Sequence, residues 1–327
     1  MAGLAAGVFL TPLRAQLRSK WLWIGAALSI VIALPNLLWQ LRHDFISFEF
    51  LQFIHARDVR IGRTDDYWID QFQVPSSFFT FPLALFGLYV LFFTERGRRY
   101  RILGWMAVIP VVLFGLAKGR AYYTGPLYPM LFAAGAADLQ RWLDSLRTIP
   151  RRLGWSVAAL LLLVSAVAVP VVLPLVPINS RHWAFVNEHN GDLREEVGWP
   201  ELAQEVARIW NTIDPAERTQ SGIYCGNYGE AGAINLYGPA YGLPPVISGI
   251  NSYWLRGPGN PSPKTVLVVG ANRKDVEQAC ASVQLAGHIT NAARVSNEET
   301  ERHPDIFLCR GMRQPLEKMW PQLRSFG

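Results

Sequence analysis

The sequence predicts a multi-spanning α-helical membrane protein followed by a small α/β extracytoplasmic domain. Half of the 327 residues are hydrophobic and only 17% are charged, a low share of charge for a water-soluble chain of this length. Long segments of the first half carry no charge at all. After about residue 178, strand-like and helix-like patterns alternate. The predicted domains are a transmembrane helical domain over 1–178 and an extracytoplasmic α/β domain over 179–327.

Five apolar segments are candidates for crossing a bilayer, because about 20 apolar residues in a helix span its hydrocarbon core. Residues 21–39, 76–94 and 153–178 contain no charged residue. The shorter segments 102–117 and 121–137 are separated by one tight turn, so we interpret them as a pair. The alternative, a buried helix bundle in a soluble protein, would require five such segments, with prolines inside them, to be placed in water.

The basic residues of the first half indicate an orientation. Eleven of the 17 Lys and Arg residues before residue 178 lie in three loops, 14–20, 95–101 and 140–152. These loops fall on alternate sides of successive segments, as the positive-inside rule requires of cytoplasmic loops. The loop 40–75 has six acidic residues against four arginines, so we expect it to face outward with everything after about 178. Charges in short runs between apolar segments predict contact with a lipid bilayer and no nucleic-acid partner.

The second half alternates between strand and helix patterns. Strands are predicted at 221–226, 264–271 and 305–310, and helices at 200–213, 273–283 and 315–326. Such alternation is typical of a small α/β layer fold. The three cysteines of the chain, Cys225, Cys280 and Cys309, all lie here. A disulfide is allowed outside the membrane, and Cys225 and Cys309 can be neighbours on their predicted strands, but burial as small side chains is the favoured interpretation.

The segment GNYGEAGAINLYGPAYGLP at 226–244, with SGINSYWLRGPG at 248–259, is the most distinctive stretch of the second half. Its glycine spacing after a strand resembles a phosphate-cradling loop, but it lacks the dinucleotide fingerprint. Amides, a carboxylate and aromatic rings suit the hydroxyls and faces of a sugar. The candidates for sugar or acceptor contacts are Asn227, Glu230, Asn251, Tyr253 and Trp254. Glycine turns with aromatic packing explain the same residues equally well.

The turn AKGRAYYTGPLYP at 117–129 places cations and phenols between two apolar segments. Lys118 and Arg120 fall at the expected outer edge of the membrane, where they can meet a lipid phosphate. Charge-assisted hydrogen bonds from such a pair, with a tyrosine hydroxyl as a further donor, suit a phosphodiester. Tyr122 and Tyr123 also suit an interface, with the ring in lipid and the hydroxyl in water. A snorkelling Lys/Arg pair with an aromatic belt explains the same composition without function.

These residues carry a resemblance to a known family. The turn K-G-R-A-Y-Y-x-x-P-L-Y-P resembles that of the bacterial glycosyltransferases related to dolichyl-phosphate-mannose–protein mannosyltransferases and to the lipid A aminoarabinose transferases, of the C-type superfamily. Residues 34–53 are similar to the segment before the outward amphipathic helix of that family. The glycine-rich segment of the second half resembles the C-terminal domain of many bacterial members. The resemblance covers most of the chain and is specific for the family rather than for the substrate.

The resemblance implies a multi-pass enzyme of the bacterial inner membrane that transfers a hexosyl or pentosyl group from a polyprenyl-phosphate donor to a glycan, lipid or protein acceptor. It implies that Tyr123, with Lys118, Arg120 and Tyr122, binds the donor phosphate. No cofactor is required, and a divalent cation is an optional participant.

One departure from the family concerns the catalytic carboxylate. The family carries it in the first outward loop, and no such motif opens this chain. Residues 1–13 are too short to span and resemble the end of a helix, so the chain is expected to be the C-terminal part of a longer enzyme. Asp65 and Asp66 are candidates for the general base, although they lie in a later loop. The alternative function is a non-catalytic membrane protein whose outer domain binds glycan or assembles envelope machinery.

Overall fold

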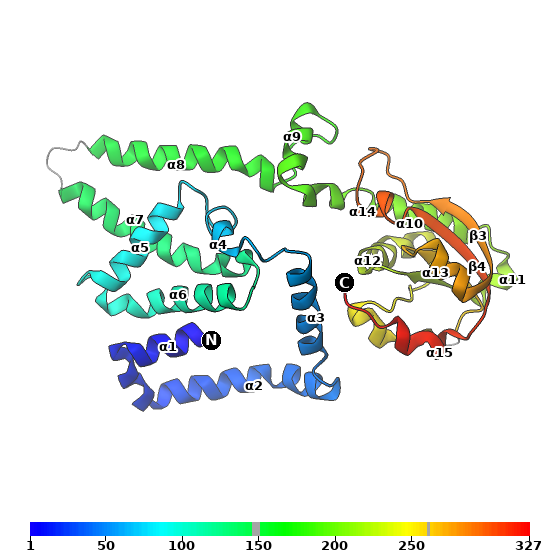
Figure 1. Ribbon diagram of the computed structural model, residues 1–327, viewed down its shortest axis with the longest axis horizontal. Coiled ribbons are helices and arrows are strands. Elements are labelled where there is room, and N and C mark those ends of the chain that lie inside the picture. The colour runs from blue at the N-terminus through cyan, green and yellow to red at the C-terminus, as the bar shows by residue number, and fades with distance from the viewer. Residues whose placement is uncertain (146–150, 260–261) are drawn as a thin grey trace. The chain divides into compact units, whose positions relative to one another are not determined.

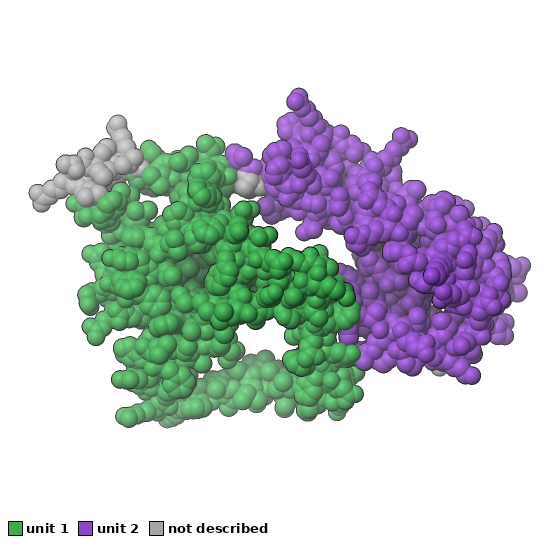
Figure 2. Space-filling view, viewed as in Figure 1, with its two compact units in different colours: residues 1–166 green, residues 167–327 purple. Residues whose placement is uncertain are grey.

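The computed structural model describes residues 1–145, 151–259 and 262–327 and divides the chain into two compact units (Figures 1 and 2). Unit 1 comprises Met1–Ala166 and unit 2 comprises Val167–Gly327. The boundary falls inside the helix Arg151–Val172. The described part of unit 1 is helical: α1 (Ala2–Leu10), η1 (Pro12–Arg18), α2 (Lys20–Arg42), α3 (Ile46–Arg60), α4 (Tyr67–Asp70), α5 (Phe81–Phe93), η2 (Arg98–Tyr100), α6 (Arg101–Leu116), η3 (Ala121–Leu127), α7 (Tyr128–Ser145) and the first part of α8 (Arg151–Val172).

Three helices in the described residues are long and apolar enough to cross a membrane, as judged by length and composition: Lys20–Arg42, Arg98–Leu116 and Gly154–Val172. The sequence predicts five. The predicted segment 76–94 contains only the 13-residue helix α5, because Ser77 and Thr80 form a hydrogen-bonded turn ahead of it. The predicted segment 121–137 begins as the 3-10 turn η3 and becomes α-helical at Tyr128. Pro126, which lacks an N–H and fixes its own φ, lies in that turn.

Glycines allow the helices of unit 1 to pack closely. A Cβ atom on Gly87 of α5 would lie 2.0 Å from the carbonyl oxygen of Leu131 in α7. A Cβ atom on Gly135 of α7 would lie 2.3 Å from the carbonyl oxygen of Leu83. Backbones therefore touch directly at this crossing, the small-residue packing that is common between helices in membranes.

Unit 2 contains a four-stranded mixed sheet in the order β1-β2-β4-β3. β1 and β2 are parallel, and β4 is antiparallel to both β2 and β3. The elements of this unit are α9 (Arg181–His189), η4 (Gly191–Glu196), α10 (Trp199–Trp210), α11 (Pro215–Arg218), β1 (Ser221–Cys225), α12 (Tyr228–Tyr237), η5 (Gly238–Tyr241), η6 (Asn251–Arg256), β2 (Thr265–Val269), α13 (Arg273–Ala279), β3 (Cys280–His288), α14 (Glu298–Glu301), β4 (Asp305–Met312), α15 (Leu316–Met319) and η7 (Trp320–Leu323).

The three predicted strands and the predicted helix 200–213 are confirmed, but two predicted helices are wrong in extent. The helix predicted over 273–283 ends at Ala279, and the chain continues as β3, which pairs with β4. Pairing with a strand that is distant in sequence thus decides the conformation of residues 280–283. The helix predicted over 315–326 consists of two single turns, α15 and η7, because Pro321 prevents a continuous helix.

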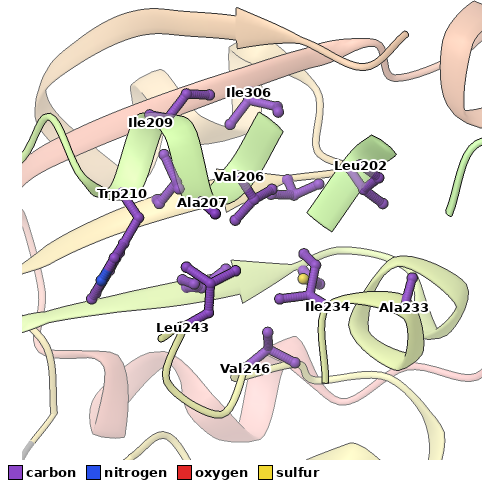
Figure 3. Packing of buried hydrophobic residues seen from close by; sticks show 14 of the residues in the cluster. Leu202, Val206, Ala207, Ile209, Trp210, Ala233, Ile234, Leu243, Val246 and Ile306 are labelled. Carbon is purple, nitrogen blue, oxygen red and sulfur yellow. The ribbon is translucent and has the colours of Figure 1, made fainter. Parts of the chain in front are cut away.

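The main core of unit 2 lies between one face of the sheet and the helices α10 and α12 (Figure 3). Leu202, Val206 and Ile209 recur at helical spacing along α10 and are almost completely buried. Ile234 of α12 packs into the same cluster, with Ile306 of β4. A second, smaller cluster on the other face contains Val276 of α13. Helices therefore cover both faces of the sheet, as an α/β layer fold requires.

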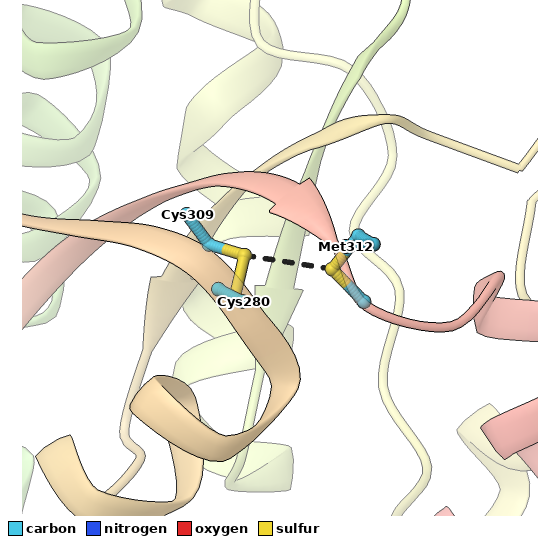
Figure 4. The surroundings of a disulfide bond; sticks show 3 residues. All are labelled: Cys280, Cys309 and Met312. Atoms are coloured by element: carbon cyan, nitrogen blue, oxygen red, sulfur yellow. Dashed lines mark hydrogen bonds between the residues drawn. A yellow bond between two sulfur atoms is a disulfide. The ribbon is translucent and has the colours of Figure 1, made fainter.

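A disulfide joins Cys280, the first residue of β3, to Cys309 of β4 (Figure 4). The Met312 sulfur lies 3.5 Å from Cys309 Sγ. The sequence allows Cys225 and Cys309 as neighbours and favours burial of the cysteines as small side chains. All three cysteines are buried. Cys309 is bonded to Cys280 and does not lie beside Cys225, because β2 and β3, not β1, flank β4. Cys225 is the free, fully buried cysteine.

Candidate functional site

The turn between α6 and η3 reverses the chain with a motif that is typical of helix C-termini. The Gly119 N–H donates to the carbonyl oxygen of Phe114 at 2.7 Å, and the Lys118 N–H donates to that of Gly115 at 3.3 Å. This 6→1 and 5→2 pattern is a Schellman motif. Lys118 takes the left-handed position with φ +51°, where glycine is the usual residue. The turn projects the exposed Lys118 side chain at the end of an apolar helix.

Arg120 pairs with an acidic residue of α3. Its Nε donates to Asp58 Oδ2 at 2.5 Å, and its Nη1 donates to the Tyr122 hydroxyl at 2.9 Å. The Asp58 side chain is 4% exposed and the Arg120 side chain 18%. The sequence analysis did not identify Asp58, which lies 62 residues before Arg120. The ion pair therefore ties α3 to the turn.

Two further arginines surround the same carboxylate. Arg57 Nη2 lies 3.5 Å and Arg63 Nη1 3.9 Å from Asp58 Oδ1. Three guanidinium groups against one carboxylate leave a formal charge of +2 in this cluster, which we call the arginine cluster: Arg57, Asp58, Arg63 and Arg120. The hydrogen bond from Arg120 lowers the pKa of Asp58 although burial opposes this. Asp58 is therefore ionised at neutral pH and serves as a fixed charge partner.

The two tyrosines of the turn lie beside this cluster. Their rings are 4.5 Å apart between centroids, and the Tyr123 ring also lies 5.6 Å from that of Phe114. Each side chain is about half exposed. The structure thus brings Arg120 and Tyr122 together, with the Tyr123 ring tilted against that of Tyr122. The exposed Lys118 side chain makes no hydrogen bond or ion pair with the described residues.

Buried hydrogen bonds link the turn at 117–129 to Gln71, which follows α4. Gln71 Oε1 accepts hydrogen bonds from the hydroxyls of Thr124 and Tyr128, both at 2.9 Å. All three residues are buried. Gln71 and Tyr128 also line a mainly apolar cavity of about 320 Å³ between α4, α5, α6 and α7. The charged turn and an apolar cavity are therefore neighbours within unit 1.

Asp65 and Asp66 do not belong to the arginine cluster. Both side chains are exposed, and neither carboxylate is hydrogen-bonded to another described residue. Among residues 1–145, 151–259 and 262–327, no three His, Cys, Asp or Glu side chains form a set that could hold a metal ion. The optional divalent cation of the sequence analysis thus has no evident ligand set in the described chain.

The sugar-contact candidates of unit 2 make internal hydrogen bonds. Asn227 caps α12 by accepting from the Gly229 N–H at 2.9 Å. Asn251 Oδ1 accepts from the N–H of Gly327 at 3.3 Å. The Tyr253 hydroxyl accepts from Asn235 Nδ2 at 3.4 Å. These contacts fit the alternative interpretation of the segment, glycine turns with aromatic packing.

Trp254 and Trp320 form a reciprocal pair. The Trp254 indole donates to the Trp320 carbonyl at 3.0 Å, and the Trp320 indole donates to the Trp254 carbonyl at 3.1 Å. The Trp254 ring is partly buried against the cluster around Trp320. Its indole N–H is therefore committed to the fold of the C-terminal segment.

Glu230 is the most unusual of these candidates. It is 2% exposed, and its Oε2 has no hydrogen-bond partner among the described residues. Burial raises its pKa to about 8, and the nearby carboxylates of Glu299 and Glu298 contribute in the same direction. A carboxyl group in such a position is largely protonated at neutral pH. In this conformation its carboxyl group is not accessible to a sugar.

The residues missed by sequence reasoning, Arg57, Asp58 and Arg63, lie on or just after α3. Their signal is the arginine spacing in ARDVRIGR, with one acid inside it, but a linear pattern does not show which cation the acid pairs with. Comparison of the chain with protein-family models, curated proteins and solved structures finds no match.

Proposed function

We propose that this chain is part of a membrane glycosyltransferase that moves a sugar from a polyprenyl-phosphate donor to an envelope acceptor at the outer face of the bacterial inner membrane. The observation that carries the proposal is the arginine cluster beside an apolar cavity. Arg120 is held by Asp58, and two more arginines share that carboxylate. One site thus combines excess positive charge with an apolar compartment, as a lipid phosphate requires.

The phosphate-binding role follows from charge and donor geometry. The carboxylate of Asp58 neutralises the charge of only one of the three arginines. The two remaining positive charges can bind a phosphodiester. The Arg63, Tyr122 and Tyr123 side chains are each about half exposed. Guanidinium groups bind phosphate through charge-assisted, often bidentate hydrogen bonds. The exposed ammonium group of Lys118 adds a further positive charge beside the arginine cluster.

The prenyl part of the donor belongs in an apolar environment next to its phosphate. The cavity of about 320 Å³ has Trp68, Phe72 and Phe81 in its walls. Its polar wall residues, Gln71 and Tyr128, are hydrogen-bonded to each other. Part of a polyprenyl chain can therefore lie there while Gln71 and Tyr128 remain hydrogen-bonded.

The proposed reaction is displacement at the anomeric carbon of the donor sugar. An acceptor hydroxyl attacks, a carboxylate takes its proton, and the polyprenyl phosphate leaves with its charge stabilised by the arginine cluster. Asp58 is a poor general base because the Arg120 hydrogen bond lowers its pKa. Asp65 and Asp66 remain the candidates for the base in this chain, with exposed carboxylates.

The membrane placement rests on the apolar helices and on the charges of the loops. α2 has no buried residue and exposes tryptophan, leucine and isoleucine side chains along its length, so lipid is its expected solvent. We propose that the basic loops 14–20, 95–101 and 140–152 are cytoplasmic and that unit 2 is extracytoplasmic; residues 146–150 of the last loop lie outside the described residues. The disulfide of unit 2 is compatible with an oxidising compartment.

Binding of two matched lipids tests the phosphate site. The full chain in lipid nanodiscs is titrated with undecaprenyl phosphate and with undecaprenol, which lacks the phosphate. Arg120→Ala is expected to weaken binding of the phosphate lipid roughly 10- to 150-fold, the range for one charge-assisted hydrogen bond. Binding of the alcohol should stay unchanged. Arg96→Ala is the matched control, because Arg96 also pairs with an aspartate, Asp138 of α7 at 3.4 Å, away from the arginine cluster.

Equal affinity of the wild-type chain for the two lipids would contradict the phosphate role. Phosphate-selective binding without any transfer of sugar from a polyprenyl-phosphate donor would favour the non-catalytic alternative. If Asp65→Asn or Asp66→Asn abolishes sugar transfer but leaves lipid binding intact, the substituted aspartate is identified as the general base.

A further inference from the structure

Unit 2 contains a cavity of about 370 Å³ on the face of the sheet opposite the main core. Its volume is within the range of about 300–1,000 Å³ that is usual for ligand pockets. The floor is formed by Val266 and Val268 of β2 and by the Cys280–Cys309 disulfide. None of the sugar-contact candidates of unit 2 is among the lining residues.

One end of the cavity coincides with a topological switch point of the sheet. After β1 the chain enters α12, which packs in the core on one face. After β2 it enters α13, whose Val276 packs on the opposite face. Connections that leave adjacent parallel strands toward opposite faces open a crevice at the carboxyl ends of those strands, where open α/β sheets bind their ligands.

The residues that follow the two strands line the cavity at this end. They are Gly226 after β1, and Gly270, Ala271 and Asn272 after β2. A Cβ atom on Gly226 would lie 2.1 Å from the Gly270 carbonyl oxygen, and Gly270 has φ +69°. Both positions therefore require glycine, and the end of the cavity is formed by backbone rather than by side chains.

The chemistry of the walls changes along the cavity. The far end is formed by flexible or branched apolar side chains, including Met312, Leu316 and Met319. Methionine side chains adapt to irregular hydrocarbon shapes. The lining residues with polar side chains are Tyr224, Asn272, Asp275 and His303, of which Asn272 and Asp275 are exposed. No Lys or Arg is among the lining residues that the structure describes, so a phosphate or carboxylate would find no fixed cation.

We infer that this cavity binds the hydrocarbon chain of a neutral or cationic amphiphile, with the polar head of the ligand at the carboxyl ends of β1 and β2. The apolar walls accept the chain, and Asn272, Asp275 and backbone groups receive the head. The inference concerns unit 2 alone and does not depend on glycosyl transfer.

Photolabelling of the full chain in lipid nanodiscs tests the inference. The probes are dodecyl glucoside and dodecanoic acid, each with a diazirine at the same position of the chain. The glucoside should label peptides from Val266–Cys280 and from Met312–Leu323, and the anionic acid should label them at least roughly fivefold less, a ratio that about 1 kcal/mol produces. Asp275→Asn should reduce this discrimination.

Two variants that fill the cavity and one surface control distinguish labelling inside the cavity from labelling on the protein surface. Met319→Trp and Ala279→Phe add bulk to lining residues and should each reduce glucoside labelling of both peptides roughly fivefold or more. Leu236→Trp adds the same ring to a residue of α12 that is 71% exposed and should leave labelling unchanged. Protection of the buried Cys225 thiol from alkylation verifies that unit 2 is folded in each variant.

Labelling that is spread over other surface peptides would overturn the inference. So would labelling of the two peptides that neither filling variant reduces while Cys225 stays protected. Stronger labelling by the acid than by the glucoside would overturn the assigned head-group chemistry.

Discussion

At the scale of single residues, Asp58 organises the candidate phosphate site without being suited to bind phosphate itself. Its buried carboxylate orients Arg120 and lies within 4 Å of two other guanidinium groups. Loss of its charge leaves Arg120 without its ion-pair partner. Asp58 is therefore a positioning residue under the proposed function.

We expect Asp58→Asn to weaken binding of undecaprenyl phosphate roughly 5- to 30-fold, because an unpaired Arg120 no longer has a fixed orientation. In a transfer assay the effect should appear in KM for the donor more than in kcat. Isothermal titration in nanodiscs and initial rates measure the two quantities. A gain in phosphate affinity, as expected if net positive charge alone controlled binding, would contradict the positioning role.

Lys118 combines a charge with an unfavourable backbone conformation, and two substitutions separate these effects. Lys118→Gly removes the charge and relieves a left-handed conformation that costs about 1–2 kcal/mol for a residue with a Cβ atom. Lys118→Ala removes the charge and keeps the strain. We expect equal losses of phosphate-lipid affinity and a higher melting temperature for the glycine variant. Unequal affinities would mean that the shape of the turn, not the charge, governs binding.

Glu230 makes the stability of unit 2 depend on pH. Its pKa rises from 4.5 to about 8 on folding, so the folded state binds the proton more tightly than the unfolded state. The stability that this proton contributes is complete below about pH 4.5 and is lost as the pH rises through about 8. We expect the urea midpoint of unit 2 to fall across this window, and Glu230→Gln to remove much of the fall.

The midpoint can be followed with a brief methanethiosulfonate pulse at Cys225, the buried free thiol. Comparison of wild type and variant at each pH cancels the pH dependence of the labelling reaction. Parallel curves for the two chains would show that Glu230 does not cause the pH dependence.

At the scale of elements, the disulfide stabilises β3, whose first four residues, 280–283, the sequence pattern assigns to a helix. β3 is an edge strand and is joined to β4 by Cys280–Cys309, which are 29 residues apart. Closing a loop of this length is worth about 3–4 kcal/mol by reducing the entropy of the unfolded chain.

The double variant Cys280→Ser/Cys309→Ser should therefore lose about 3–4 kcal/mol of unfolding free energy in unit 2. Cys225 is then the single cysteine of the chain, as it is the single free thiol of the wild type, and its alkylation against urea concentration measures the loss. The control is Ser282→Ala on the exposed side of β3, which should change the midpoint little. An unchanged midpoint in the double variant would show that strand pairing alone secures β3.

At the scale of the whole molecule, the proposed topology predicts which loops a membrane-impermeant thiol reagent reaches. Gln73→Cys in the outward loop and Glu188→Cys in unit 2 should label in intact cells. Arg99→Cys should label only after permeabilisation, because its loop is basic and assigned to the cytoplasm. The wild-type chain, whose free thiol is buried, provides the background. Labelling of Arg99→Cys in intact cells would reject the orientation.

The sequence by itself determined the features that depend on local composition. Charge-free runs predicted five apolar spans, of which three are helices long enough to cross a membrane. Leu202, Val206 and Ile209 at helical spacing predicted α10. The buried runs at 221–226 and 264–271 predicted β1 and β2. Hydrophobic periodicity reports which face of a segment is buried, so these elements needed no knowledge of their partners.

Only the tertiary structure decided the features that depend on partners far along the chain. Residues 280–283 are a strand because β4 lies beside them, and Cys309 is bonded to Cys280 because β3 rather than β1 is its neighbour. Asp58 and Arg120 are 62 residues apart, and no local pattern relates them. Strand pairing, disulfide formation and ion pairing depend on which residues are close in space. The pattern of residues along the sequence does not contain this information. The ion pair that orders the candidate site was therefore visible only once the chain was folded.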